Sequence, residues 1–235
     1  MTELPLQGGS ITGPVRVGDT VRRATGPHAA FVHQVLGHFE RHGWTGAPRF
    51  LGVDDKGREI LTFVEGHIAW RSRDGVDSVE SLEAVARLVR EFHDLTAGTP
   101  LAGDQEVLCH NDLAPKNTVY RESLPIAFLD WDLAAPGARV HDVAHVCWQY
   151  LDLGPGVTDP PETARRFRAI CDAYGLADRA HVVDTVLWWQ DRCARGIEAG
   201  ADAGDPAMSR LRAAGAVESV REAHEWVARH RHWVA

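Results

Sequence analysis

The sequence predicts an α+β protein with two lobes: a small antiparallel sheet lobe over residues 1–66 and a mostly helical lobe over residues 67–235. Three observations lead to this fold class. Short apolar segments separated by turn residues fill the first 64 positions. Apolar residues then recur every three or four positions through most of the remaining chain. Three brief strand-like segments, at 106–109, 118–120 and 126–129, interrupt the helical part.

The first lobe is predicted to be strands around one helix. Valines between positions 15 and 21 mark two short strands separated by the turn pair Gly18-Asp19. Apolar residues from 31 to 39 follow at helical spacing. Segments 49–53 and 59–64 surround an Asp-Asp-Lys-Gly turn, and this pattern predicts a hairpin.

The second lobe is predicted to begin with a long amphipathic helix, because residues 79–95 place one apolar stripe on a helical surface. After the three strand-like segments, helical periodicity returns and continues almost to the end. We expect these later helices near 141–152, 162–174, 179–199 and 207–230.

Composition excludes several classes of protein. The formal net charge of −8 argues against a nucleic-acid partner, since such proteins usually present a basic face. No apolar stretch approaches the roughly 18–20 residues of a membrane span, and the N-terminus lacks the pattern of a secretory signal. Four cysteines without a CxxC pair favour reduced thiols in a cytoplasmic protein. Nothing in the sequence indicates an oligomeric state.

The chemistry is concentrated in the strand-like segments. An apolar strand runs into His110-Asn111-Asp112, and Asn117 follows five positions after Asp112. A second apolar strand then ends at Asp130. Phosphoryl transfer needs a carboxylate that orients the acceptor hydroxyl and oxygen ligands for Mg²⁺. The spacing therefore predicts Asp112 as the catalytic base, with Asn117 and Asp130 as ligands of Mg²⁺.

The segment from His110 to Asn117 resembles the catalytic loop of the aminoglycoside phosphotransferase and choline kinase-like family, which has a protein-kinase-like fold. Leu129-Asp130-Trp131-Asp132 is similar to the metal-binding motif of that family, and 141–144 resembles the element that follows it. The Gly-Gly opening and the Ala-Pro-Arg-Phe-Leu-Gly segment resemble a bacterial subgroup named after trifolitoxin immunity. The resemblance implies a kinase that uses Mg²⁺ and ATP or GTP to phosphorylate a small-molecule acceptor, such as an aminoglycoside or another amine.

The resemblance also implies roles for particular positions. Nucleotide-binding residues would come from a phosphate loop, from one arginine of the second strand and from the hinge between the lobes. Asp142 would brace the catalytic loop, and His110 would be structural rather than a proton carrier. The nucleotide-binding positions implied in this way are Gly8, Gly9, Ser10, Arg22, Val64, Glu65 and Gly66.

Two departures from the family pattern bear on activity. The strand that carries a phosphate-binding lysine in relatives reads Arg22-Arg23 here, and we favour Arg22 with Arg23 as the alternative. The following helix has Val32 where relatives have a glutamate that pairs with the lysine. A nucleotide-binding pseudokinase or immunity-type protein without turnover is therefore an alternative function.

A metal-dependent phosphohydrolase is a second alternative. His93-Asp94 and His141-Asp142 form paired His-Asp motifs, and His145 lies one helical turn after His141, a spacing that can bind Zn²⁺. Proteins of that class are all-helical, however, so the strands predicted before residue 66 argue against it.

Overall fold

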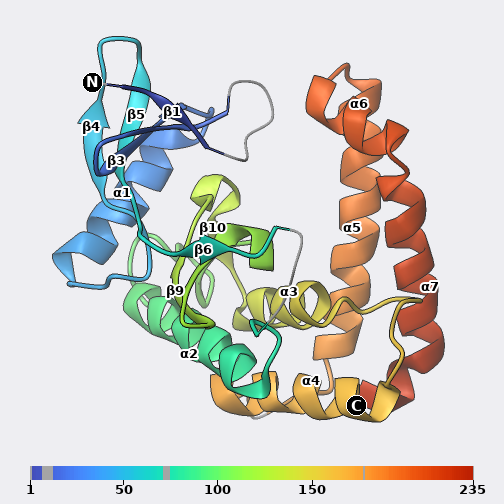
Figure 1. The fold of residues 1–235 in the computed structure, drawn as a ribbon. Helices are drawn as coiled ribbons and strands as arrows, with labels where there is room; N and C mark the ends of the chain where they lie inside the picture. Colours follow the sequence, from blue (N-terminus) through green and yellow to red (C-terminus); the bar gives the residue numbers. More distant parts are fainter. Residues whose placement is uncertain (1, 7–12, 71–74, 177, 235) are drawn as a thin grey trace.

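The computed structural model describes residues 2–6, 13–70, 75–176 and 178–234. Strands gather around α1 at one end of the molecule, and helices build the other end (Figure 1). The predicted α+β class, with an antiparallel sheet lobe and a mostly helical lobe, is confirmed.

The sheet lobe holds five antiparallel strands in the order β1-β2-β3-β5-β4. One face of the sheet is covered by α1 (Ala29–Arg41), whose buried stripe includes Val35 and Phe39. Side chains alternate between the two faces of the strands, so Leu61 and Glu59 of β5 share the covered face and are both buried. The strands are β1 (Leu4–Pro5), β2 (Val15–Val17), β3 (Thr20–Ala24), β4 (Phe50–Val53) and β5 (Arg58–Thr62).

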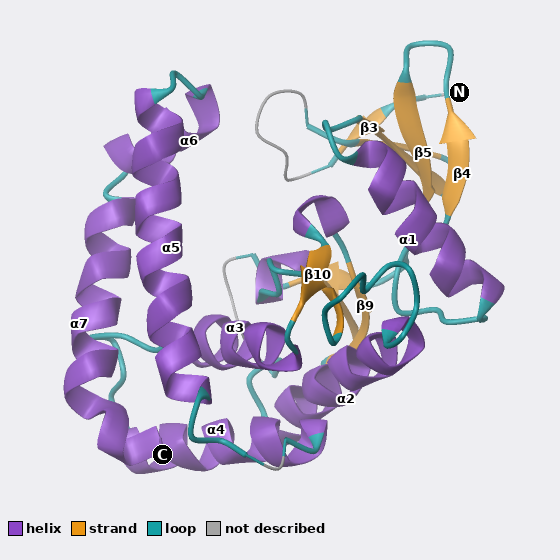
Figure 2. Ribbon diagram, turned by 180° about the vertical axis from the view of Figure 1, so that it is seen from behind, coloured by secondary structure: helices purple, strands orange, loops and turns teal. Residues whose placement is uncertain are grey.

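The helical lobe contains six helices within the described ranges. In it, α5 and α7 lie side by side, and α6 covers their ends (Figure 2). No described helix combines the length and the apolar character that crossing a bilayer requires. The helices are α2 (Val79–Thr96), α3 (Arg139–Leu151), α4 (Pro160–Tyr174), α5 (Val182–Asp202), α6 (Pro206–Ala213) and α7 (Ala216–Val234).

The single helix predicted for residues 207–230 is wrong, because the chain forms two helices there. Gly215 has φ of +80° between α6 and α7, a left-handed conformation that glycine adopts without steric cost and that ends a helix. Apolar periodicity continues across this break, so it conceals the boundary in the sequence.

Short strands complete the helical lobe and were not all predicted. Strands β6 (His67–Ile68), β8 (Thr118–Arg121) and β9 (Leu124–Phe128) form one sheet, while β7 (Val107–Cys109) pairs with β10 (Ala135–Gly137). Strand β10 was not among the predicted strand-like segments. It contains Pro136, which an edge strand tolerates because proline has no N–H to donate to the ladder.

The two lobes meet between Thr62 and His67. The five-stranded sheet ends at Thr62, and the next strand, β6, already pairs with β8 of the helical lobe. A Cβ on Gly66 would lie 2.5 Å from Val119 Cγ1 and 2.6 Å from the Tyr120 carbonyl oxygen. Only glycine therefore fits where the connection passes this close to β8.

Candidate active site

The loop between β7 and β8 holds Asp112 and Asn117 against each other. The Asn117 amide nitrogen donates to the Asp112 carboxylate at 2.8 Å and to its backbone carbonyl at 2.9 Å. Pro115 begins a single turn of 3₁₀-helix over Pro115–Asn117 that folds the loop back. Because the amide nitrogen of Asn117 is engaged, its amide oxygen is the atom left for a metal ligand.

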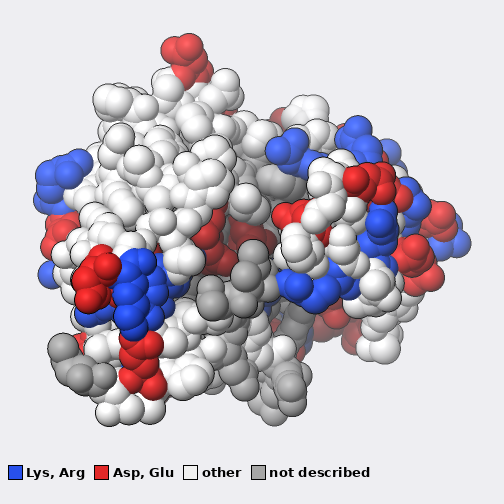
Figure 3. All heavy atoms as spheres, turned by 90° about the horizontal axis from the view of Figure 1, so that it is seen from above, with Lys and Arg blue, Asp and Glu red and all other residues white. Residues whose placement is uncertain are grey.

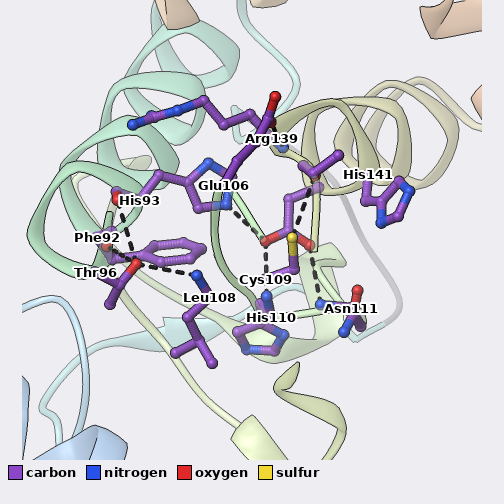
Figure 4. A network of polar contacts seen from close by, with 12 residues as sticks. Phe92, His93, Thr96, Glu106, Leu108, Cys109, His110, Asn111, Arg139 and His141 are labelled. Carbon is purple, nitrogen blue, oxygen red and sulfur yellow. Dashed lines mark hydrogen bonds and ion pairs between the residues drawn. The ribbon is translucent and has the colours of Figure 1, made fainter. Parts of the chain in front are cut away.

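Asp142 is fully buried in α3 and binds the start of this loop. Its partners His93, His110 and Asn111 are drawn in Figure 4. Its carboxylate accepts hydrogen bonds from the backbone N–H groups of His110 at 2.7 Å and Asn111 at 2.9 Å. Asn111 has φ of +64°, a strained backbone conformation for a residue with a side chain. The two charge-assisted hydrogen bonds hold the backbone in this conformation, which directs the chain toward Asp112.

A chain of hydrogen bonds supports Asp142 from behind. His93 Nε2 donates to Asp142 at 3.0 Å, and its Nδ1 accepts from the Tyr174 hydroxyl at 2.8 Å, which in turn accepts from Arg139 at 3.2 Å. Burial acts to raise the pKa of Asp142, but the hydrogen bonds from His93 and from the Asn111 backbone N–H outweigh it. The pKa of Asp142 therefore lies below its ordinary value.

Both nitrogens of the His110 ring form hydrogen bonds with backbone groups. Its Nε2 donates to the Leu129 carbonyl at 3.0 Å, and its Nδ1 accepts from the Asp112 N–H at 3.3 Å. The Leu129 N–H donates to the Asn117 carbonyl at 2.8 Å. These contacts join the catalytic loop to the strand that ends at Asp130, and they leave neither nitrogen of His110 free to carry a proton to a substrate.

Asp130 projects from a bend between two buried aromatic residues. Phe128 and Trp131 are buried on either side of it, whereas the Asp130 side chain is 48% exposed. Trp131 packs against Phe39 of α1 and Phe92 of α2, with ring centroids 5.0 and 5.1 Å apart. Asp130 itself has φ of +63°. The aromatic anchors thus fix a strained bend that presents the carboxylate to solvent.

The arginine that reaches this carboxylate is Arg23, which was the alternative to Arg22 in the sequence prediction. Arg23 Nη1 lies 2.9 Å from Asp130 Oδ1, and Nη2 lies 2.6 Å from Asp132 Oδ1. Arg22 points to the opposite face of β3, toward Thr20 and Asp54. Side chains alternate between the two faces of a strand, so the neighbouring residues Arg22 and Arg23 point to opposite faces of β3.

The residues around Arg23 fit a divalent cation. Three carboxylates, those of Glu59, Asp130 and Asp132, face the one Arg23 guanidinium, so negative charge is in excess. Burial raises the pKa of the Asp132 carboxyl, the Arg23 guanidinium opposes this rise, and the adjacent Asp130 carboxylate adds to it. The resulting pKa of Asp132 lies above its ordinary value. A further cation would relieve this excess, and carboxylate and amide oxygens are the ligands that Mg²⁺ prefers.

The hinge residues are tied to both lobes. The Glu65 side chain accepts from Arg16 at 2.7 Å, and its carbonyl accepts from Arg121 at 3.1 Å. A pocket of about 530 Å³ is lined by Val64 and Glu65 together with residues of both lobes, but none of the residues around Asp130 lines it. The implied phosphate-loop residues Gly8, Gly9 and Ser10 lie outside the described residues.

Two partners of the site were missed by the sequence reasoning. Glu59 faces Arg23 across β3 and β5 and binds it, although no role was expected for Glu59. His93 was noted only as half of a His-Asp motif, yet it contacts the buried Asp142. The register of β3 and β5 would have identified the Glu59–Arg23 pair. The His93–Asp142 pair joins residues 49 positions apart, and no local sequence pattern indicates it.

The two His-Asp motifs meet through the His93–Asp142 hydrogen bond, but His141 and His145 have separate partners. His141 stacks on Trp188, with ring centroids 5.2 Å apart, whereas His145 Nδ1 donates to the Leu113 carbonyl at 2.8 Å. Burial lowers the pKa of His145, which keeps its ring neutral in that contact. The five-stranded sheet is incompatible with the all-helical fold that the phosphohydrolase alternative requires.

Comparisons with known proteins agree with this geometry. A family model described as a phosphotransferase enzyme family matches residues 97–213. The trifolitoxin immunity protein of Rhizobium leguminosarum bv. trifolii is 31% identical in an alignment of 210 residues that covers 79% of each chain.

Solved structures share the fold at lower identity. A choline/ethanolamine kinase family protein from Mesorhizobium loti superimposes with a TM-score of 0.66 at 13% identity, covering 100% of this chain and 92% of its own. The GDP complex of an aminoglycoside 2'-phosphotransferase-IIIa gives a TM-score of 0.63 at 13% identity, covering 98% and 93%. The chain therefore belongs to the aminoglycoside phosphotransferase and choline kinase-like family, in the group of the trifolitoxin immunity protein.

Proposed function

We propose that this protein is a Mg²⁺-dependent kinase that moves the γ-phosphate of ATP or GTP to a hydroxyl group of a small molecule. The observation that carries the proposal is the joining of the two chemical segments. Leu129 donates to the Asn117 carbonyl and accepts from His110, so the loop of Asp112 and the strand end at Asp130 share one edge of the helical lobe. A catalytic carboxylate and oxygen ligands for a cation are what phosphoryl transfer needs.

Each group has a role in this proposal. Asp112 orients the acceptor hydroxyl and takes its proton as the phosphate is transferred. Asn117 and Asp130 would hold Mg²⁺, which when bound supplies positive charge to the phosphate oxygens. Arg23 lies beside Asp130 and provides a guanidinium for the phosphates. The hinge residues Val64, Glu65 and Gly66 would contact the purine base of the nucleotide through backbone atoms. The Glu65 carbonyl already accepts a hydrogen bond from Arg121, so other backbone atoms of the hinge would make this contact.

We propose an amine-bearing small molecule as the acceptor. The net charge of −8 favours a cationic substrate over an anionic one. Seen from above, acidic side chains lie between the sheet lobe and the part that carries α6 (Figure 3). The structural neighbours include aminoglycoside and choline/ethanolamine kinases, and one of them holds GDP, so both ATP and GTP are donors to test. We propose a cytoplasmic location, which suits four unpaired cysteines.

A nucleotide-binding immunity protein without turnover is the second candidate. Two observations favour it: the name of the 31% identical relative, and the position of Val32, which is buried in the core and offers no charge to Arg23. In this case Arg23 and Asp130 would bind nucleotide, and Asp112 would have no acceptor to activate.

Thermal unfolding with Mg²⁺ and either nucleotide tests both candidates. A ligand that binds only the folded state raises the unfolding midpoint. We expect a Mg²⁺-dependent rise for the wild type that Asp130→Ala loses. Asp184→Asn, an exposed aspartate paired with Arg231, is the matched control and should retain it. Phosphate transfer to an aminoglycoside or another amine then separates the candidates, because an immunity protein without turnover would show the thermal rise alone. The absence of any rise in the wild type would refute both.

A further inference from the structure

Arg23 and Glu59 form a directly opposed pair on neighbouring antiparallel strands. They are register partners in β3 and β5, and Arg23 Nε donates to Glu59 Oε1. Glu59 is only 2% exposed. A buried carboxylate is costly unless its oxygens are hydrogen-bonded and its charge is paired. Its presence in the sheet core therefore depends on partners that satisfy it.

The second oxygen of Glu59 is bound by a helix residue. His33 of α1 lies with Nε2 2.8 Å from Glu59 Oε2. A carboxylate only accepts, so His33 Nε2 carries the hydrogen and donates. The His33 ring stacks on Phe50 of β4, with centroids 3.5 Å apart and planes 14° from parallel. Glu59 is thus held between the arginine of β3 and the helix.

This arrangement sets the direction of the guanidinium. The group is planar and its five N–H donors have fixed relative directions. Once Nε is bound to Glu59, the plane of the guanidinium and the directions of its terminal N–H groups are restricted. The terminal nitrogens reach Asp130 at 2.9 Å and Asp132 at 2.6 Å. Contact with Glu59 therefore determines where the phosphate-facing side of Arg23 points.

We propose that Glu59 is the positioning residue for Arg23, in place of the helix glutamate that Val32 replaces, and that His33 couples α1 to this pair. The inference rests on the proposed function, because Arg23 is taken to bind the phosphates. Glu59 and His33 act through Arg23 and do not themselves touch the nucleotide. Movement of α1 would then change the direction of Arg23 through His33 rather than through a direct ion pair.

Two measurements on the full chain test this proposal. The first is solvent exchange of the Arg23 Nε–H by NMR without nucleotide, with the signal identified by its loss in Arg23→Lys. The second is the dissociation constant for Mg²⁺-ATP and Mg²⁺-GTP. In Glu59→Gln we expect exchange to accelerate and nucleotide affinity to fall, each by about 10-fold to 100-fold, as expected when a hydrogen bond between charged groups is lost.

Variants of His33 separate positioning from packing and keep the Glu59 carboxylate in the chain. His33→Phe keeps the ring on Phe50 but removes the donor, and should shift both measurements in the same direction as Glu59→Gln. His33→Gln keeps a donor without the ring, and should stay nearer the wild type. Glu3→Gln removes another glutamate–arginine contact of the sheet lobe, with Arg58 at 2.8 Å, and is the control.

The outcomes are distinct. If the exchange of Arg23 Nε–H in Glu59→Gln and His33→Phe matches that in Glu3→Gln, the proposal is wrong. If the exchange of Arg23 Nε–H accelerates in these two variants and their nucleotide affinity falls, the proposal is supported. Should the wild type bind neither nucleotide, the proposed function fails, while the exchange rates still decide whether Glu59 and His33 orient Arg23.

Discussion

Asp142→Asn is the sharpest test of how the catalytic loop is held. The carboxylate is fully buried and accepts three hydrogen bonds: two at Oδ2, from the His110 N–H and from His93, and one at Oδ1, from the Asn111 N–H. An asparagine keeps one acceptor oxygen and places an NH₂ group at the other position. In the better orientation the oxygen serves His110 and His93, and the NH₂ group faces the Asn111 N–H.

The expected cost follows from this count. One hydrogen bond to a charged group is lost, worth about 1.5–3 kcal/mol, and a buried N–H is left without a partner. The remaining bonds become neutral and weaker. We expect the free energy of unfolding to fall by about 3–5 kcal/mol, similar to breaking a buried ion pair. For a domain of this size, that lowers the unfolding midpoint by roughly 6–20 °C.

The pH dependence of this cost has a defined sign. The pKa of Asp142 is lowered in the folded protein, so its contribution is present above the unfolded pKa, near 4, and is lost as pH falls through the folded value. The difference between wild type and Asp142→Asn should therefore narrow below about pH 4.

Urea unfolding followed by circular dichroism over a pH series measures both effects. Asp94→Asn is the control, because Asp94 is 48% exposed and pairs with Arg90 and Arg139 at the surface, where a pair is worth about 0–1 kcal/mol. A loss for Asp142→Asn as small as that of the control, or one that stays constant into acid, would refute the reasoning.

Three further predictions concern the chemistry and the hinge. Asp112→Asn should reduce turnover by about 10²–10⁴-fold with little change in nucleotide affinity, and near-wild-type turnover would remove Asp112 from its role. Arg23→Gln should weaken nucleotide binding measured by calorimetry, whereas Arg22→Gln, which alters the opposite face of β3, should not; the reverse result would restore the original preference. Gly66→Ala should lower the unfolding midpoint because its Cβ would contact β8 at 2.5 Å, at a cost of about 1–3 kcal/mol. Gly156→Ala, whose Cβ would meet open space, should change the midpoint little.

The spacing of polar residues along the chain was enough to predict which groups lie together in the candidate site. His110, Asp112 and Asn117 share one loop, and their relative positions depend on a few bonds within it. Asp130 follows the next strand but one, which pairs with β8 and brings Leu129 beside Asn117. Local geometry of this kind is dictated by turns and strand ends, which sequence patterns indicate well.

Strand faces and helix breaks were harder to predict from the sequence. Neighbouring residues of a strand point to opposite faces, so the choice between Arg22 and Arg23 depended on the register with β5, which the amino-acid pattern did not specify. The boundary between α6 and α7 was hidden for a different reason. Apolar spacing runs through it, and only the backbone conformation of Gly215 ends the helix there.

By itself, then, the sequence determined the α+β class and was enough to propose the catalytic loop and the ligands for Mg²⁺, since these proposals follow from residue types close together in the chain. Only the tertiary structure decided which arginine meets Asp130, that Glu59 and His33 hold it, and that His93 supports Asp142. Those contacts join residues 26 to 107 positions apart. Their partners are chosen by the packing of whole elements, a choice that no local pattern records.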